Sequence, residues 1–214
     1  MTQKDIPNCF LPVTQLSEKL EKGGLSSLEL IEEYLERIRK HDRNLGAFID
    51  VYEEEAHKAA AASDMARASG HIIGPLQGIP VAVKDIIDIE GKITTGGSMV
   101  WKNRRSTLTA TLVRRMVEAG MIVLGKTHTV EFAMGSFGTN QHMGSPKNPW
   151  DLEEHRATGG SSAGTAAAVA AGLSPWGIGT DTGGSVRIPS AWCGLTGLKT
   201  SVGRISTHGV LPLS

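Results

Sequence analysis

The chain has 214 residues, with 22 basic and 22 acidic side chains and only two cysteines, Cys9 and Cys193. This length predicts one domain with a sizeable core, and the balanced charge argues against proteins that bind nucleic acid or a charged membrane surface. No apolar run reaches the roughly 18 residues of a membrane span, and the first ten residues do not have the pattern of a signal peptide. The two distant cysteines have no metal-ligand spacing and indicate free thiols, so we expect a cytoplasmic protein.

Residues 1–70 are predicted to form the helical N-terminal part of this domain. Ser26 and Glu29 have the spacing of a capping box, and apolar side chains then recur every three or four positions from Leu28 to Ile38. A second helix is predicted over residues 51–68, which are rich in alanine and glutamate and end near a glycine. We interpret both helices as scaffold that covers a core.

Residues 71–214 are predicted to form the core of the same domain. Strands are expected over residues 79–83 and 121–124, with a further extended segment over 176–179. Helices are expected between them, over 107–119 and 165–171. Strands that alternate with helices favour a layered α/β fold. Most of the 26 glycines also lie in this part, which indicates many tight turns.

Residues 120–127 match the phosphate-binding pattern G-x-x-x-x-G-K-[ST]. That site needs a strand before the first glycine and a flexible loop between the two glycines. Here a helix is predicted before the first glycine, and Met, Ile, Val and Leu between the glycines predict a buried strand. The context therefore argues against a nucleotide site.

Residues 160–164 match the nucleophile elbow G-x-S-x-G, with Ser162 as the nucleophile. The elbow must follow a buried strand, and residues 151–158 are too polar to form one. It also needs an acid and then a histidine further along the chain, for which Asp181 and His208 are the only convenient pair. We therefore disfavour an α/β-hydrolase.

Two turns rich in glycine and hydroxyl groups, residues 159–164 and 180–185, flank an alanine-rich segment, and Lys84 ends an apolar run upstream. Either turn alone would be explained by a capping serine. Two such turns with a strand-end lysine, and with no histidine nearby, favour Ser–Lys hydrolytic chemistry over Ser–His–Asp. The second turn would supply backbone N–H donors to an oxyanion, from Thr182, Gly183, Gly184 and Ser185.

These residues belong to longer motifs that closely resemble the amidase signature family, in the same order and spacing. The matching segments are G-I-P-V-A-V-K-D (Gly78–Asp85), T-T-G-G-S (Thr94–Ser98), N-P-W (Asn148–Trp150), G-G-S-S-A-G (Gly159–Gly164), G-T-D-T-G-G-S-V-R-I-P-S (Gly179–Ser190) and G-L-T-G-L-K-T-S-V-G-R (Gly194–Arg204).

The resemblance implies a triad in which Ser185 is the nucleophile, Ser161 the bridging serine and Lys84 the base. It also implies a cis peptide bond before Ser161, a supporting role for Ser162, and a place for Met134 in the acyl pocket. Lys84 must be neutral to act as a base, and its apolar neighbours favour the neutral amine.

Two further residues of the second turn are expected to have structural roles. We expect Asp181 to organise the glycine turn and Arg187 to pair with a carboxylate of the fold. The histidines are expected to be non-catalytic.

The implied fold is a layered α/β/α arrangement with a mixed central sheet. The implied function is hydrolysis of a small carboxylic amide through a seryl acyl-enzyme, without a metal or organic cofactor and without nucleic-acid or membrane partners; a homo-oligomer is compatible with it. The alternative is the glutamine-hydrolysing subunit of a tRNA-dependent amidotransferase, although the segment T-H-G-V-L-P-L-S resembles stand-alone amidases more. Family members are considerably longer, so we expect the core to be incomplete at its C-terminus.

Overall fold

The computed structural model describes residues 6–213; residues 1–5, which belong to the segment considered above for a signal peptide, and residue 214 lie outside the described part. The helices and strands in chain order are α1 (Val13–Glu21), α2 (Ser27–Leu45), β1 (Phe48–Val51), α3 (Glu53–Ala68), β2 (Pro80–Lys84), α4 (Thr111–Glu118), β3 (Ile122–Thr127), α5 (Ala163–Ala170), β4 (Gly177–Ile178) and α6 (Arg187–Trp192).

Helix α2 begins where the capping box predicts. The Ser26 hydroxyl accepts a hydrogen bond from the Glu29 N–H, and the Glu29 carboxylate accepts one from the Ser26 N–H, so two N–H groups of the first turn are satisfied. The helix ends at Gly46, whose φ of 64° is left-handed. The predicted helix over 51–68 begins two residues late, because residues 48–51 form β1. The prediction of a helical N-terminal part did not include this strand, and the start of the second helix was wrong by two residues.

The four strands form one mixed sheet in the order β1-β3-β2-β4. Strand β2 runs parallel to both β3 and β4, whereas β1 is antiparallel to β3. All five residues of β2 are buried, as expected for a central strand covered on both faces. The mixed α/β fold predicted from the sequence is confirmed.

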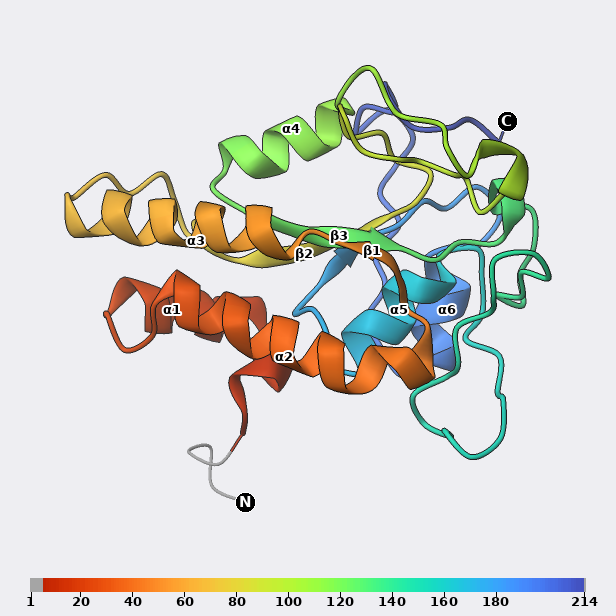
Figure 1. The fold of residues 1–214 in the computed structure, drawn as a ribbon, viewed down its shortest axis with the longest axis horizontal. Helices are drawn as coiled ribbons and strands as arrows, with labels where there is room; N and C mark the ends of the chain where they lie inside the picture. The colour runs from red at the N-terminus through yellow and green to blue at the C-terminus, as the bar shows by residue number, and fades with distance from the viewer. Residues whose placement is uncertain (1–5, 214) are drawn as a thin grey trace.

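Helices cover both faces of this sheet. Figure 1 shows α4 on one side of the sheet and α5 and α6 on the other. The larger apolar core joins the N-terminal helices to the sheet and α5, and includes Leu35, Ile79, Leu124 and Ala167. A second core lies under α4 around Val83, Ile87 and Val113. Helix α4 begins at Thr111 rather than near residue 107, and β3 extends to Thr127.

Helix α5 lies very close to the backbone that follows β3, and Gly164 makes this approach possible. A Cβ atom at Gly164 would lie 2.3 Å from the Ala47 carbonyl oxygen and 2.4 Å from the His128 nitrogen. The Gly164 N–H also donates to the His128 carbonyl. The start of α5, with the serines that precede it, is therefore fixed against the end of the sheet.

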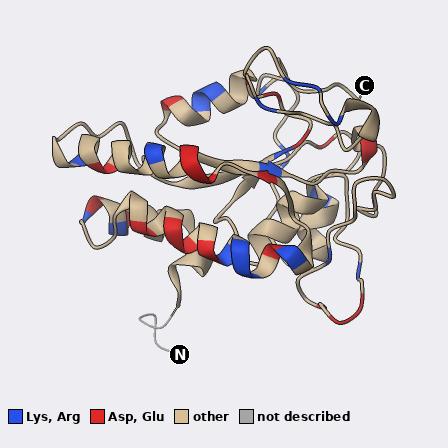
Figure 2. Cartoon of the chain, viewed as in Figure 1, with Lys and Arg blue, Asp and Glu red and all other residues tan. Residues whose placement is uncertain are grey.

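Charged side chains of both signs are interspersed along the surface helices, as Figure 2 shows for α2. Among residues 6–213, no helix is both long enough and apolar enough to cross a membrane.

Candidate active site

The candidate site lies at the carboxyl ends of the three parallel strands. Lys84 is the last residue of β2, and the strand pairing places it opposite Thr127 at the end of β3. Thr180 follows β4 by two residues and Thr129 follows β3 by two. Because parallel strands end at one edge of a sheet, residues distant in sequence meet here, which is the usual position of ligand sites in α/β sheets.

Lys84 is fully buried, and hydroxyl groups surround its amine. Its Nζ donates to Ser161 Oγ at 2.7 Å and to Thr180 Oγ1 at 2.9 Å. Burial lowers the pKa of Lys84 to about 7, although the negative charge of Asp181 acts in the opposite direction. A substantial fraction of this lysine is therefore neutral near pH 7 and able to accept a proton.

Ser161 and Ser162 are both buried at the start of α5. The Gly160–Ser161 peptide bond is cis, as the family resemblance implies. The Ser162 hydroxyl contacts the Thr180 backbone, accepting from its N–H and donating to its carbonyl, each at 3.3 Å. The Ser162 N–H donates to the Ser185 carbonyl at 3.3 Å, so the two glycine turns meet at this point.

The second turn is organised by Asp181. Its carboxylate accepts from the N–H groups of Gly184 at 2.7 Å and Val186 at 3.1 Å, and it forms an ion pair with Arg187 at 3.0 Å. The Arg187 guanidinium holds the pKa of Asp181 well below its usual range. The structural roles expected for Asp181 and Arg187 are therefore confirmed. Ser185 is half-buried in this turn, and within residues 6–213 its hydroxyl makes no hydrogen bond to Ser161.

One expected oxyanion donor is engaged elsewhere. The Gly184 N–H is directed at Asp181, so it is not available as we expected. The N–H groups of Thr182, Gly183 and Ser185 make no hydrogen bond within the described residues. Thr182 and Gly183 are exposed residues, and Ser185 is half-buried.

The segment expected to line the acyl pocket has an unusual backbone. Phe132 and Ala133 have left-handed φ values of 47° and 61°, and Met134, which follows them, is 72% exposed. The Phe132 ring packs edge-on against Trp101. Contact of Met134 with a substrate remains a prediction.

The alternative motifs do not form the sites that their patterns suggest. Lys126, the lysine of the phosphate-loop pattern, lies in strand β3, is 1% exposed and pairs with Asp85 at 3.2 Å. The residues before the elbow pattern, 151–158, form turns rather than a strand. Within residues 6–213, no group of three His, Cys, Asp or Glu side chains is arranged to hold a metal ion.

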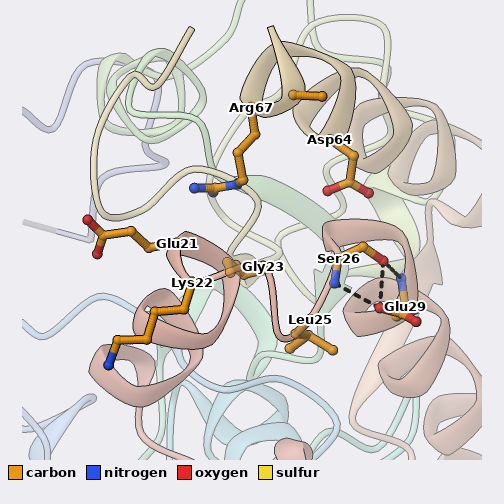
Figure 3. A pocket seen from close by; sticks show the side chains of 10 residues that line it. Glu21, Lys22, Gly23, Leu25, Ser26, Glu29, Asp64 and Arg67 are labelled. Carbon is orange, nitrogen blue, oxygen red and sulfur yellow. Dashed lines mark hydrogen bonds between the residues drawn. The ribbon is translucent and has the colours of Figure 1, made fainter. Parts of the chain in front are cut away.

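A surface pocket of about 450 Å³ lies between the turn after α1 and the end of α3 (Figure 3). Two of its polar side chains are already hydrogen-bonded to backbone groups. Asp64 accepts from the N–H groups of Ser27 and Leu28, and Arg67 donates to the Gln77 carbonyl. None of its lining residues belongs to the candidate site.

The sequence pattern did not identify Thr180 as a partner of Lys84, although its hydroxyl lies in the predicted second turn. It also missed Thr129, whose hydroxyl donates to the Ser161 carbonyl at 3.1 Å, and Asn140, which donates to the Thr129 carbonyl at 3.1 Å. Neither residue stands in a motif that would have suggested this contact.

The chain is similar to proteins of one known family. The family model described as Amidase matches residues 29–214. The chain is 47% identical over 199 residues to the A subunit of the glutamyl-tRNA(Gln) amidotransferase of Chromohalobacter salexigens, covering 93% of this chain and 40% of the relative.

Solved structures show the same fold. The native peptide amidase of Stenotrophomonas maltophilia superposes with a TM-score of 0.90 at 38% identity, covering 97% of this chain and 44% of that one. A second solved structure is described as an unexpected vestigial protein complex that reveals the evolutionary origins of an s-triazine catabolic enzyme. It superposes with a TM-score of 0.91 at 38% identity, covering 94% of this chain and 44% of that one. The chain thus spans about 40% of the length of the curated relatives it matches.

Proposed function

The chain belongs to the amidase family, and we propose that it carries the catalytic residues of an enzyme that hydrolyses a carboxylic amide through a seryl acyl-enzyme. One observation carries this proposal: a fully buried lysine whose amine lies 2.7 Å from the hydroxyl of an equally buried serine. A lysine and a serine that meet away from solvent, beside a glycine turn that bears a second serine, have the components of an amine-based proton relay.

The relay begins with neutral Lys84. A neutral amine has two hydrogens and one lone pair; a hydrogen given to Thr180 Oγ1 leaves the lone pair free to face Ser161. Lys84 accepts the Ser161 proton as Ser161 accepts the proton of Ser185. The Ser185 oxygen then attacks the amide carbonyl carbon.

The N–H groups of Thr182, Gly183 and Ser185, which make no hydrogen bond within the described residues, then stabilise the resulting oxyanion in this proposal. The tetrahedral intermediate collapses when the relay returns the proton to the leaving nitrogen, which breaks the C–N bond and leaves an ester on Ser185. Water then attacks this ester with the same relay as base, and releases the acid.

Two substrate classes remain for this chemistry. A stand-alone amidase acts on simple amides, and the structural likeness to a peptide amidase supports that class. The second candidate is release of ammonia from glutamine within an amidotransferase, which the 47% identity to the amidotransferase relative supports. The two buried free thiols, Cys9 and Cys193, support a reducing, cytoplasmic location for either class.

The test uses the complete gene product and its Ser185→Ala variant. We expect the wild type to be labelled by a serine-directed fluorophosphonate and to release acid from a panel of amides, and the variant to do neither. Turnover of glutamine that requires added partner subunits would identify the amidotransferase class, whereas turnover of simple amides by the protein alone would identify the amidase class. Full activity in the Ser185→Ala variant would refute the assignment.

A further inference from the structure

The Ser161 backbone is held by the segment that follows β3. The Ser161 carbonyl accepts a hydrogen bond from the Thr129 hydroxyl at 3.1 Å, which it shares with the Val130 carbonyl at the same distance, and another from the Val130 N–H at 3.2 Å. Thr129 is 1% exposed, so water cannot readily replace its hydroxyl. The position of Ser161 therefore depends on the position of Thr129.

Thr129 is in turn held by Asn140, which is 5% exposed. The Asn140 amide donates to the Thr129 carbonyl at 3.1 Å and to the Gly97 carbonyl at 2.7 Å. Its oxygen accepts from the N–H groups of His142 and Met143, each at 3.0 Å. Both amide hydrogens and both lone pairs of this side chain are thus used inside the protein.

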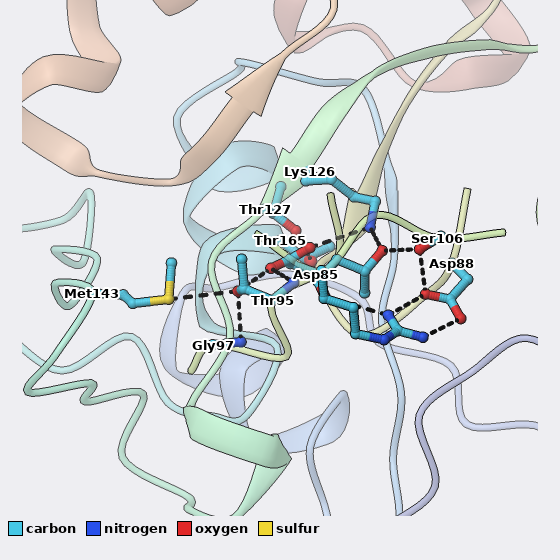
Figure 4. Close-up of polar contacts among 11 residues, drawn as sticks. Asp85, Asp88, Thr95, Gly97, Ser106, Lys126, Thr127, Met143 and Thr165 are labelled. Carbon is cyan, nitrogen blue, oxygen red and sulfur yellow. Dashed lines mark hydrogen bonds and ion pairs between the residues drawn. The ribbon is translucent and has the colours of Figure 1, made fainter. Parts of the chain in front are cut away.

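From Asn140 the hydrogen bonds continue through Gly97 and Thr95 to Asp85, the residue next to Lys84. The Gly97 N–H donates to the Thr95 hydroxyl at 2.9 Å, and the Thr95 N–H donates to the Asp85 carboxylate at 3.0 Å (Figure 4). Asp85 is anchored by the buried Lys126. Because Asp85 directly follows Lys84, the hydrogen bonds form a closed ring that starts at the base and returns to it through Ser161.

We propose that Thr129 and Asn140 are positioning residues that hold the Ser161 hydroxyl against the Lys84 amine, an inference that rests on the function proposed above. Proton transfer requires the two heavy atoms to stay near 3 Å apart, and a misplacement of about 1 Å can cost about 100-fold in rate. A ring closed through buried donors restrains that distance from both partners. If these bonds only stabilised the fold, their loss would lower stability without a selective effect on turnover.

The experiment replaces hydroxyl and amide donors while keeping side-chain shape, in the complete enzyme. Thr129→Val removes the hydroxyl, and Thr129→Ser retains it. Asn140→Asp removes the two donors and keeps the acceptor. Gln77→Glu is the matched control, because the buried Gln77 amide also donates to two carbonyls and accepts one N–H, but in the scaffold between α3 and β2.

We expect Thr129→Val and Asn140→Asp to lower kcat by about 10- to 100-fold with KM changed by less than about threefold. Thr129→Ser should restore most of the activity. Gln77→Glu should retain kcat even where its loss of stability equals that of Asn140→Asp. A second readout needs no turnover: 15N NMR titration of the Lys84 amine, assigned with Lys84→Met. Loosening of the ring admits water, so Thr129→Val should raise the pKa of Lys84 above about 7.

The possible results separate this inference from the proposed function. An active wild type with Thr129→Val unchanged in both kcat and Lys84 titration would overturn the positioning role and leave the function intact. A wild type that hydrolyses no amide, with a Lys84 titration that still responds to Thr129→Val, would overturn the function and leave the positioning role supported. Equal losses of kcat in Gln77→Glu and Asn140→Asp would also overturn the positioning role.

Discussion

The two buried lysines provide a sharp test of the physical argument. Lys84 and Lys126 are 0% and 1% exposed and lie near the ends of adjacent strands. Among the described residues, only hydroxyl groups accept from the Lys84 amine. The Lys126 amine, in contrast, contacts the Asp85 carboxylate at 3.2 Å in addition to the Thr94 hydroxyl at 2.8 Å. Replacing each lysine by methionine keeps an unbranched apolar side chain as far as Cε and removes the terminal amine. We expect the two substitutions to change stability in opposite directions at pH 7.

The magnitude for Lys84 follows from its pKa. A decrease from 10.5 to about 7 corresponds to about 5 kcal/mol of unfavourable free energy for burying this amine. Methionine removes that cost but leaves the Ser161 and Thr180 hydroxyls without a partner, at about 1 kcal/mol each. Lys84→Met should therefore stabilise the protein by about 3 kcal/mol at pH 7 while it abolishes turnover. Lys126→Met should destabilise it by about 3–5 kcal/mol, because Asp85 is left as an unpaired buried charge.

The pH dependence of stability tests the direction of the effect of Lys84→Met. The unfolded chain binds the Lys84 proton more tightly than the folded chain, so the cost of burial is fully present below pH 7 and disappears as the pH rises to 10.5. Urea unfolding of wild type and Lys84→Met should show the variant to be more stable at pH 7, with the advantage gone by about pH 9.5. A Lys84→Met protein that is less stable than wild type at pH 7, or a difference that does not vary with pH, would refute the buried neutral amine.

Three further outcomes follow from the same site. The acid limb of kcat should lie near pH 7, with about a tenfold loss one pH unit below it, because only neutral Lys84 accepts a proton; a limb near 10 would contradict this. Arg187→Met should move that limb to higher pH, since unpaired Asp181 would raise the pKa of Lys84 more strongly, and an unmoved limb would show that the ion pair does not act on the base. In steady-state assays, Ser161→Ala and Lys84→Ala should each cost about 1,000-fold or more and the double variant should cost little beyond that; fully additive losses would exclude a shared relay.

The sequence by itself determined the features that depend on neighbouring residues. The capping box at Ser26 set the start of α2, and the unbroken apolar run before Lys84 set a buried central strand. The glycine turns predict candidate serines, because serine hydroxyls beside glycine backbones recur in nucleophile and oxyanion sites. These signals are local, so a pattern of a few residues was enough to predict them.

Tertiary structure decided the features that depend on contacts between distant residues. Strand β1 was missed, because four residues gain strand geometry only by pairing with β3, more than 70 positions away. The Gly184 N–H was assigned to an oxyanion, whereas the folded turn directs it to Asp181.

The different surroundings of Lys84 and Lys126 could not be predicted from the sequence either. The protonation of a lysine depends on its burial and its nearest partner, and the residues beside it in the chain determine neither. The same holds for Thr129 and Asn140. Their contacts close only when the ends of β2 and β3 and the start of α5 come together at one edge of the sheet.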